Sequence, residues 1–61
     1  MADYTFENHG SLFLVRAHNI DAKAWLVEHT DGQWFGGALA VEHRYAAGLA
    51  EGLVADGFTV A

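Results

Sequence analysis

The sequence contains no cysteine. Disulfide bonds therefore cannot stabilise the fold, and their absence is typical of a reducing compartment, so we expect a cytoplasmic protein. We expect the 61 residues to form a single domain, 1–61. A chain of this length buries only about 60% of the surface that its unfolded form exposes. Its stability must come from the hydrophobic core, from a partner or from self-association.

Cations are also scarce. The lysines and arginines are limited to Arg16, Lys23 and Arg44, which stand against eight carboxylates and leave a net charge of −5. Nucleic-acid binding needs clustered cations to replace condensed counterions, and an anionic membrane surface attracts basic segments. We therefore expect no direct contact with nucleic acid or membrane, and a protein partner with a basic surface instead.

Long apolar runs are missing as well. No stretch approaches the roughly 18 residues that a membrane-spanning helix needs, and the first residues show no signal-peptide pattern. Core-forming residues are abundant, however, because 52% of the chain is hydrophobic and two Trp, two Tyr and four Phe are present. A disordered chain would lack these aromatic residues.

No residue pattern predicts catalysis, a metal or a cofactor. The four histidines are too widely spaced for a zinc site. The only serine, Ser11, falls inside a predicted strand without a partner base. Glu42-His43 with Tyr45 could form an acid–base group, but we interpret the Glu-His pair as a surface strand end and helix start. The pair Gly36-Gly37 lacks the lysine of a phosphate loop, and we expect it to provide flexibility or backbone room for Trp34 or Trp25. The chain is thus not expected to be an enzyme.

Hydrophobic periodicity predicts the order β-β-α-β-α-β. Asn19 is a good helix N-cap, and Gly32 is expected as the C′ residue that ends the first helix. Together these elements predict an α/β (α+β) two-layer sandwich, with a small three- or four-stranded sheet and two helices on one face. The predicted strands are 4–7, 11–16, 38–42 and 58–60, the predicted helices are 20–30 and 43–55, and 33–37 is a loop or an irregular strand start.

The second predicted strand is apolar on both of its faces. We expect Leu12 and Leu14 to face the helices, which leaves Phe13 and Val15 on the opposite face. Such an uncovered apolar patch predicts a homodimer. The expected core consists of the inward apolar side chains of all elements: Phe6, Leu12, Leu14, Trp25, Leu26, Leu39, Val41, Leu49, Leu53 and Phe58.

The candidate contact surface is an aromatic segment that follows an acidic one. Trp34 and Phe35 come after Asp31, close to a helix end. Exposed aromatic residues surrounded by acids are typical of a binding hot spot, although they could also serve as a lid on the core, and the acids could simply keep the surface solvated. The predicted partner-binding residues are Glu28, Asp31, Trp34, Phe35 and Tyr45.

In the segments 9–14, 24–26, 33–39, 41–42 and 44–45, the chain resembles a group of short uncharacterised bacterial and mobile-element proteins. The resemblance implies no activity and assigns no functional residue. In size and acidity alone, the chain is similar to phage-encoded inhibitors such as anti-CRISPR proteins. We therefore expect a non-enzymatic acidic interaction module, an inhibitor that binds a basic surface of a nucleic-acid-handling protein; the alternative is a structural homo-oligomer or small adaptor.

Overall fold

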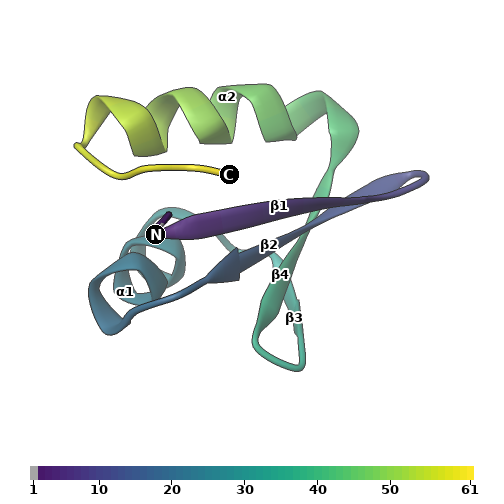
Figure 1. Cartoon of the computed structure of the whole chain (residues 1–61). Helices are drawn as coiled ribbons and strands as arrows, with labels where there is room; N and C mark the ends of the chain where they lie inside the picture. Colours follow the sequence, from purple (N-terminus) through teal and green to yellow (C-terminus); the bar gives the residue numbers. More distant parts are fainter. Residues whose placement is uncertain (1) are drawn as a thin grey trace.

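The computed structural model describes residues 2–61. A four-stranded sheet with the order β1-β2-β4-β3 forms one layer (Figure 1). Buried side chains of both helices share one core cluster with the same face of this sheet. This architecture confirms the predicted α+β sandwich. The elements are β1 (Tyr4–His9), β2 (Leu12–Ala17), α1 (Ile20–His29), β3 (Gln33–Phe35), β4 (Ala38–Glu42) and α2 (His43–Ala55).

A tight hairpin joins the first two strands. β1 pairs antiparallel with β2, and the closing pair His9 and Leu12 leaves a two-residue loop. Gly10 has a φ of 77° in this loop, a conformation that glycine adopts without steric cost. The side-chain oxygen of Asn8 also accepts a hydrogen bond from the Gly10 N–H at 3.1 Å. The local sequence therefore determines where the chain reverses.

A second hairpin replaces the predicted loop before the third strand. β3 pairs antiparallel with β4, and Phe35 lies opposite Ala38 across a two-residue turn. Gly36 and Gly37 have φ angles of 54° and 87°, as a type I′ turn requires at both central positions. A Cβ on either glycine would meet nothing within 4 Å. The expectation that they make room for a tryptophan is wrong, because the turn itself requires them.

The two strands that α1 connects, β2 and β3, are not neighbours in the sheet. β4 pairs antiparallel with both β2 and β3, so β2 and β3 run parallel with β4 inserted between them. The predicted last strand contributes only one parallel bridge, between Tyr4 and Val60. Hydrogen bonds from the Tyr4 N–H to Thr59 O (3.1 Å) and from the Ala61 N–H to Tyr4 O (2.9 Å) hold this segment beside β1 (Figure 1).

Both helices begin close to their predicted positions. The Asn19 side chain accepts a hydrogen bond from the Ala22 N–H at 2.8 Å and caps α1 as expected. The end of α1 differs, because Thr30 is the C-cap in an extended conformation and Gly32 has no positive φ. A Cβ on Gly32 would lie 2.6 Å from Leu39 Cδ1. Glycine there lets Leu39 pack closely against the loop and does not serve as a C′ residue.

The core lies between the sheet and the two helices. Leu26, Leu39 and Leu53 are fully buried, as predicted. The Tyr4 hydroxyl, also buried, donates a 2.6 Å hydrogen bond to the Ala22 carbonyl oxygen and ties β1 to α1. The predicted core residues that are partly buried and pack against this cluster are Phe6, Trp25, Val41, Leu49 and Phe58.

The prediction for the two faces of β2 is wrong. Val15 is 0% exposed and belongs to the core, whereas Leu12 and Leu14 lie on the face away from the helices and are only partly buried. The register explains the inversion, because Val15 lies opposite Phe6 in β1 and Leu39 in β4, which are both core residues. Side chains that face each other across paired strands share one side of the sheet.

Candidate functional site

The predicted aromatic pair is divided between the two faces of the sheet. Trp34 and Phe35 are consecutive in β3, so their side chains point to opposite sides. Trp34 is partly buried against the core, and the Lys23 Nζ lies 5.8 Å from the centre of its ring. Phe35 is 57% exposed. Trp34 thus covers the core as a lid, and Phe35 alone remains available for contact with another molecule.

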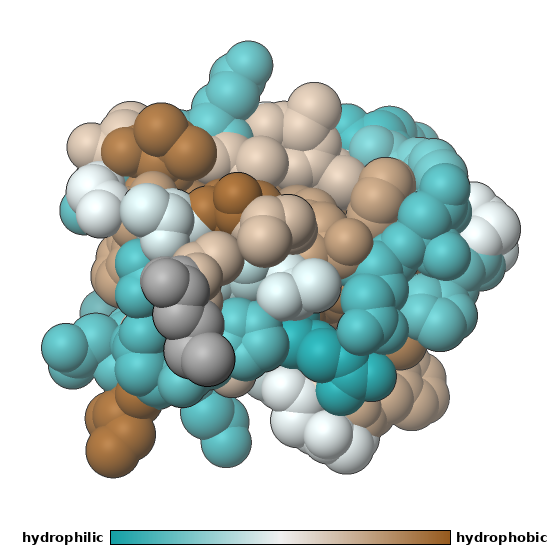
Figure 2. Space-filling view, in the orientation of Figure 1, coloured by the Kyte–Doolittle hydropathy of each residue, from teal (hydrophilic) through white to brown (hydrophobic). Residues whose placement is uncertain are grey.

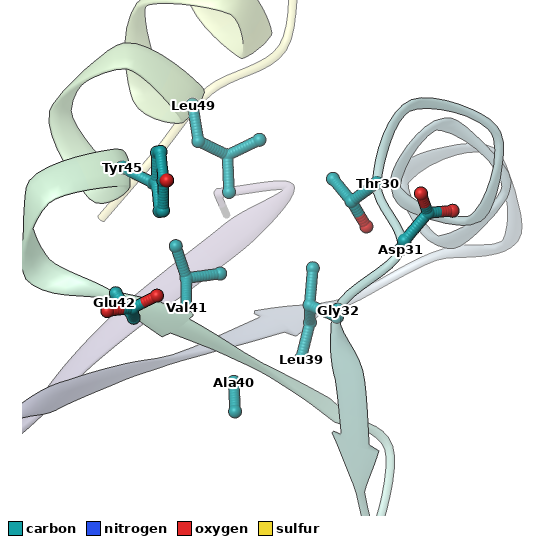
Figure 3. Close-up of a pocket in the computed structure, with 9 residues that line it drawn as sticks. All are labelled: Thr30, Asp31, Gly32, Leu39, Ala40, Val41, Glu42, Tyr45 and Leu49. Carbon is teal, nitrogen blue, oxygen red and sulfur yellow. The ribbon is translucent and has the colours of Figure 1, made fainter.

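Asp31 and Tyr45 meet in one groove, although 14 positions separate them in the sequence. The groove has a volume of about 560 Å³ and lies between the loop after α1, the strand β4 and the first half of α2 (Figure 3). This volume falls within the usual range of ligand pockets, about 300–1,000 Å³. Its lining residues are Thr30, Asp31, Gly32, Leu39, Ala40, Val41, Glu42, Tyr45 and Leu49.

Apolar side chains fill the middle of the groove and carboxylates stand at its sides. Figure 3 shows Leu39 and Val41 rising from β4 while Leu49 comes down from α2. Asp31 and Glu42 occupy opposite sides of this apolar floor, and both are exposed. A groove of this kind can desolvate an apolar group and place negative charge at either end of it.

The one arginine beside the groove is loosely held. Arg44 Nη2 lies 3.5 Å from Glu42 Oε1, and the Arg44 guanidinium carbon lies 4.9 Å from the centre of the Tyr45 ring. The side chains of Arg44 and Glu42 remain 70% and 56% exposed. An ion pair this exposed contributes only about 0–1 kcal/mol to stability, so another charged group could replace Arg44 at Glu42.

Glu28 does not belong to this groove. It lines a shallower depression of about 330 Å³ on the outer side of α1, together with Ile20, Lys23, Ala24 and Val27. Ile20 is 86% exposed and Val27 is 57% exposed. Figure 2 shows apolar groups reaching the surface over the last turns of α2 and beside α1. The five predicted contact residues thus do not form one surface: Asp31 and Tyr45 line the groove, Glu28 lies on α1, Phe35 is exposed on β3 and Trp34 packs against the core.

The outer face of the sheet carries a second apolar surface with an ion pair beside it. Leu12, Leu14 and Phe35 share this face, because β2 and β3 alternate their side chains across the sheet. The Arg16 Nε donates to Glu7 Oε2 at 2.8 Å. This hydrogen bond is the main reason that the pKa of Glu7 lies below its ordinary value, and the contact with His9 lowers it further.

Residues 2–61 contain no group of three or more His, Cys, Asp or Glu side chains that could hold a metal ion. His43, which the sequence places after Glu42, packs its ring against Phe13 with a centroid separation of 4.6 Å. His29 stacks on Trp25 at 4.0 Å, and the Trp25 Nε1–H donates to Asp56 Oδ2 at 2.5 Å. These histidines thus make packing contacts on different elements.

The prediction from sequence missed Glu42 as a groove residue. The sequence feature that could have indicated it is the strand 38–42, in which Leu39 and Val41 alternate toward the core and Glu42 stands at the end, directly before a helix. No pattern showed that Asp31 would lie across the floor from it, because that depends on α1 and β4 packing together.

Comparisons with protein families, curated proteins and solved structures found no match for this chain. Neither helix of residues 2–61 combines the length and the apolar character needed to cross a membrane.

Proposed function

We propose that this chain is a non-catalytic binding module that contacts a basic surface of a protein partner through the groove at Asp31, Glu42 and Tyr45. The observation that carries the proposal is the apolar floor of the groove with a carboxylate on each side. The apolar floor supplies affinity and the carboxylates supply orientation and faster association. The proposed setting is the cytoplasm, in line with the absence of cysteine.

The charge of the whole molecule supports the same kind of partner. The net charge is −5, and Arg16 is already engaged by Glu7. A surface that has evolved to hold phosphates presents clustered cations, and carboxylates can compete for them. We therefore propose a nucleic-acid-handling protein as the partner and inhibition as the outcome, as expected for an anti-CRISPR-like inhibitor.

Salt titration with charge reversals tests this function. The partner is isolated by affinity capture on the immobilised protein, and its association rate is then measured by surface plasmon resonance. Asp31→Lys should slow association several-fold, and added salt should weaken binding steeply. Glu28→Lys is the matched control, because it makes the same charge change outside the groove. Affinity that is indifferent to salt and to Asp31→Lys would contradict the proposal.

The outer sheet face favours a second candidate function, a structural homodimer. Phe35 is 57% exposed there on β3, and Leu12 and Leu14 lie on the same face of the sheet on β2, with β4 between the two strands. Phe13 and Val15 cannot form this interface as expected from sequence, because they lie on the helix side. Sedimentation equilibrium over a wide concentration range, with Phe35→Ser as the disrupting variant, tests the dimer. A monomer at the highest concentration would rule it out.

A further inference from the structure

At the edge of the groove, two lining residues, Tyr45 and Glu42, already contact a guanidinium group of the chain itself. Arg44 lies with its guanidinium carbon 4.9 Å from the centre of the Tyr45 ring and its Nη2 3.5 Å from Glu42 Oε1. An aromatic ring and a carboxylate are the two groups that recognise arginine best, because the guanidinium is planar and weakly hydrated. This pair is therefore chemically suited to a cation with a flat head.

The other side of the groove offers the same kind of charge with no cation on it. Within residues 2–61, Asp31 takes part in no salt bridge and no side-chain hydrogen bond. Between Asp31 and Glu42 lie Val41 and Leu49, both partly buried. The exposed Asp31 carboxylate points away from this apolar floor, toward α1, so an aliphatic stem could rest on the apolar carbon while its charged end extends beyond the floor to the carboxylate.

We propose that the groove takes an arginine side chain from a basic segment of the partner protein. Its stem would lie on Val41 and Leu49, and its guanidinium would pair with Asp31. Arginine is favoured over lysine because its fork of N–H donors matches a carboxylate and its weak hydration lowers the cost of entering an apolar groove. This inference rests on the proposed function and names the chemistry of the occupant.

Arg44 then acts as an internal competitor. Its guanidinium partly neutralises Glu42 and covers one face of Tyr45. The incoming guanidinium pairs with Asp31 on the other side, so removing Arg44 should strengthen binding by taking a positive charge from the edge of the groove and leaving Glu42 unneutralised. This expectation separates the groove from a general attraction between opposite charges, because Lys23 carries the same charge but lies over Trp34, away from the groove.

The test is an NMR titration of the ¹⁵N-labelled protein with a blocked peptide, acetyl-Ala-Leu-Arg-Leu-Ala-amide. The control peptide has citrulline, the neutral isostere, in place of arginine. Saturable shifts should appear at the amides of Asp31, Gly32, Ala40 and Glu42, and citrulline should weaken binding about fivefold, the upper range for an exposed ion pair. Weak binding is measurable by this method because the shifts follow the bound fraction.

Matched variants then locate the charge effect. Asp31→Asn should weaken binding of the arginine peptide about threefold, and Arg44→Gln should strengthen it about threefold, both within the range of exposed pairs. Glu51→Gln on the outside of α2 and Lys23→Gln are the controls for the same changes in net charge, and each should have less than half the effect. Circular dichroism confirms that each variant keeps its fold.

The outcomes distinguish this inference from the function on which it rests. Equal binding of the arginine and citrulline peptides, or shifts outside the groove, would overturn the inference. If the captured partner still depended on Asp31 and salt in that case, the binding function would survive with a different occupant. If the partner too ignored Asp31 and salt, both proposals would fail.

Discussion

Val15 and Leu14 are neighbours in β2 whose truncation should lower stability by different amounts. Val15 is 0% exposed and packs among core residues of both layers. Val15→Ala removes two methyl groups, which costs about 1.6 kcal/mol at roughly 0.8 kcal/mol for each buried carbon. The cavity left behind raises the expected loss of unfolding free energy to about 2–3 kcal/mol.

Leu14→Ala removes more carbon but should cost less. Leu14 lies on the outer face of the sheet, where solvent reaches it, so we expect a loss of about 1 kcal/mol or less. Urea unfolding followed by tryptophan fluorescence measures both variants. A loss of 1 kcal/mol corresponds to about 4–8 °C in Tm for a domain of this size. If Leu14→Ala proved more destabilising than Val15→Ala in the monomer, the assignment of the two faces would be refuted.

Three further predictions concern stability. Leu53→Ala should cost about 2–5 kcal/mol because Leu53 is fully buried, whereas the exposed neighbour Val54 should tolerate alanine in the same thermal melt. The pKa of Asp3 is lowered, chiefly by the hydrogen bond from the Thr59 N–H, so the stability that this carboxylate contributes above pH 3.8 should be lost as the pH falls below that value. Asp3→Asn should flatten the acid unfolding curve in that range, and an unchanged curve would contradict this role. Burial raises the pKa of Tyr4 to about 12 from 10.0, so stability should fall as pH rises from 10 to 12, and tyrosinate absorbance that appears without loss of the fold would contradict it.

The helices were predictable because their signals are local. Asn19 caps α1 through its own side chain, and α2 occupies His43–Ala55, the range predicted from its apolar stripe. The turn at Gly36 and Gly37 was predicted as a loop or an irregular strand start, although its signal is equally local. Helix caps act over a few residues, so sequence alone determines them. Gly10 marks the first hairpin for the same reason.

The candidate site was predictable only in part. Asp31 and Tyr45 were expected at a contact surface, and both line the groove. Glu28 lies on another surface and Trp34 covers the core. Their separation follows from the direction of each side chain on its helix or strand relative to the neighbouring layer, which composition does not reveal.

The sequence by itself determined the two helices, the first hairpin, the α+β class and the acidic surface, because each depends on residue type or short spacing. Tertiary structure decided which face of β2 is buried, since that strand is apolar on both sides and only its register with Phe6 and Leu39 selects Val15. It also decided the packing role of Gly32, because a Cβ there would lie 2.6 Å from Leu39 Cδ1 and force that side chain to shift. The groove exists for the same reason: Asp31 and Glu42 come to opposite sides of one apolar floor only once α1, β4 and α2 have packed together, and long-range packing is not encoded in any local pattern.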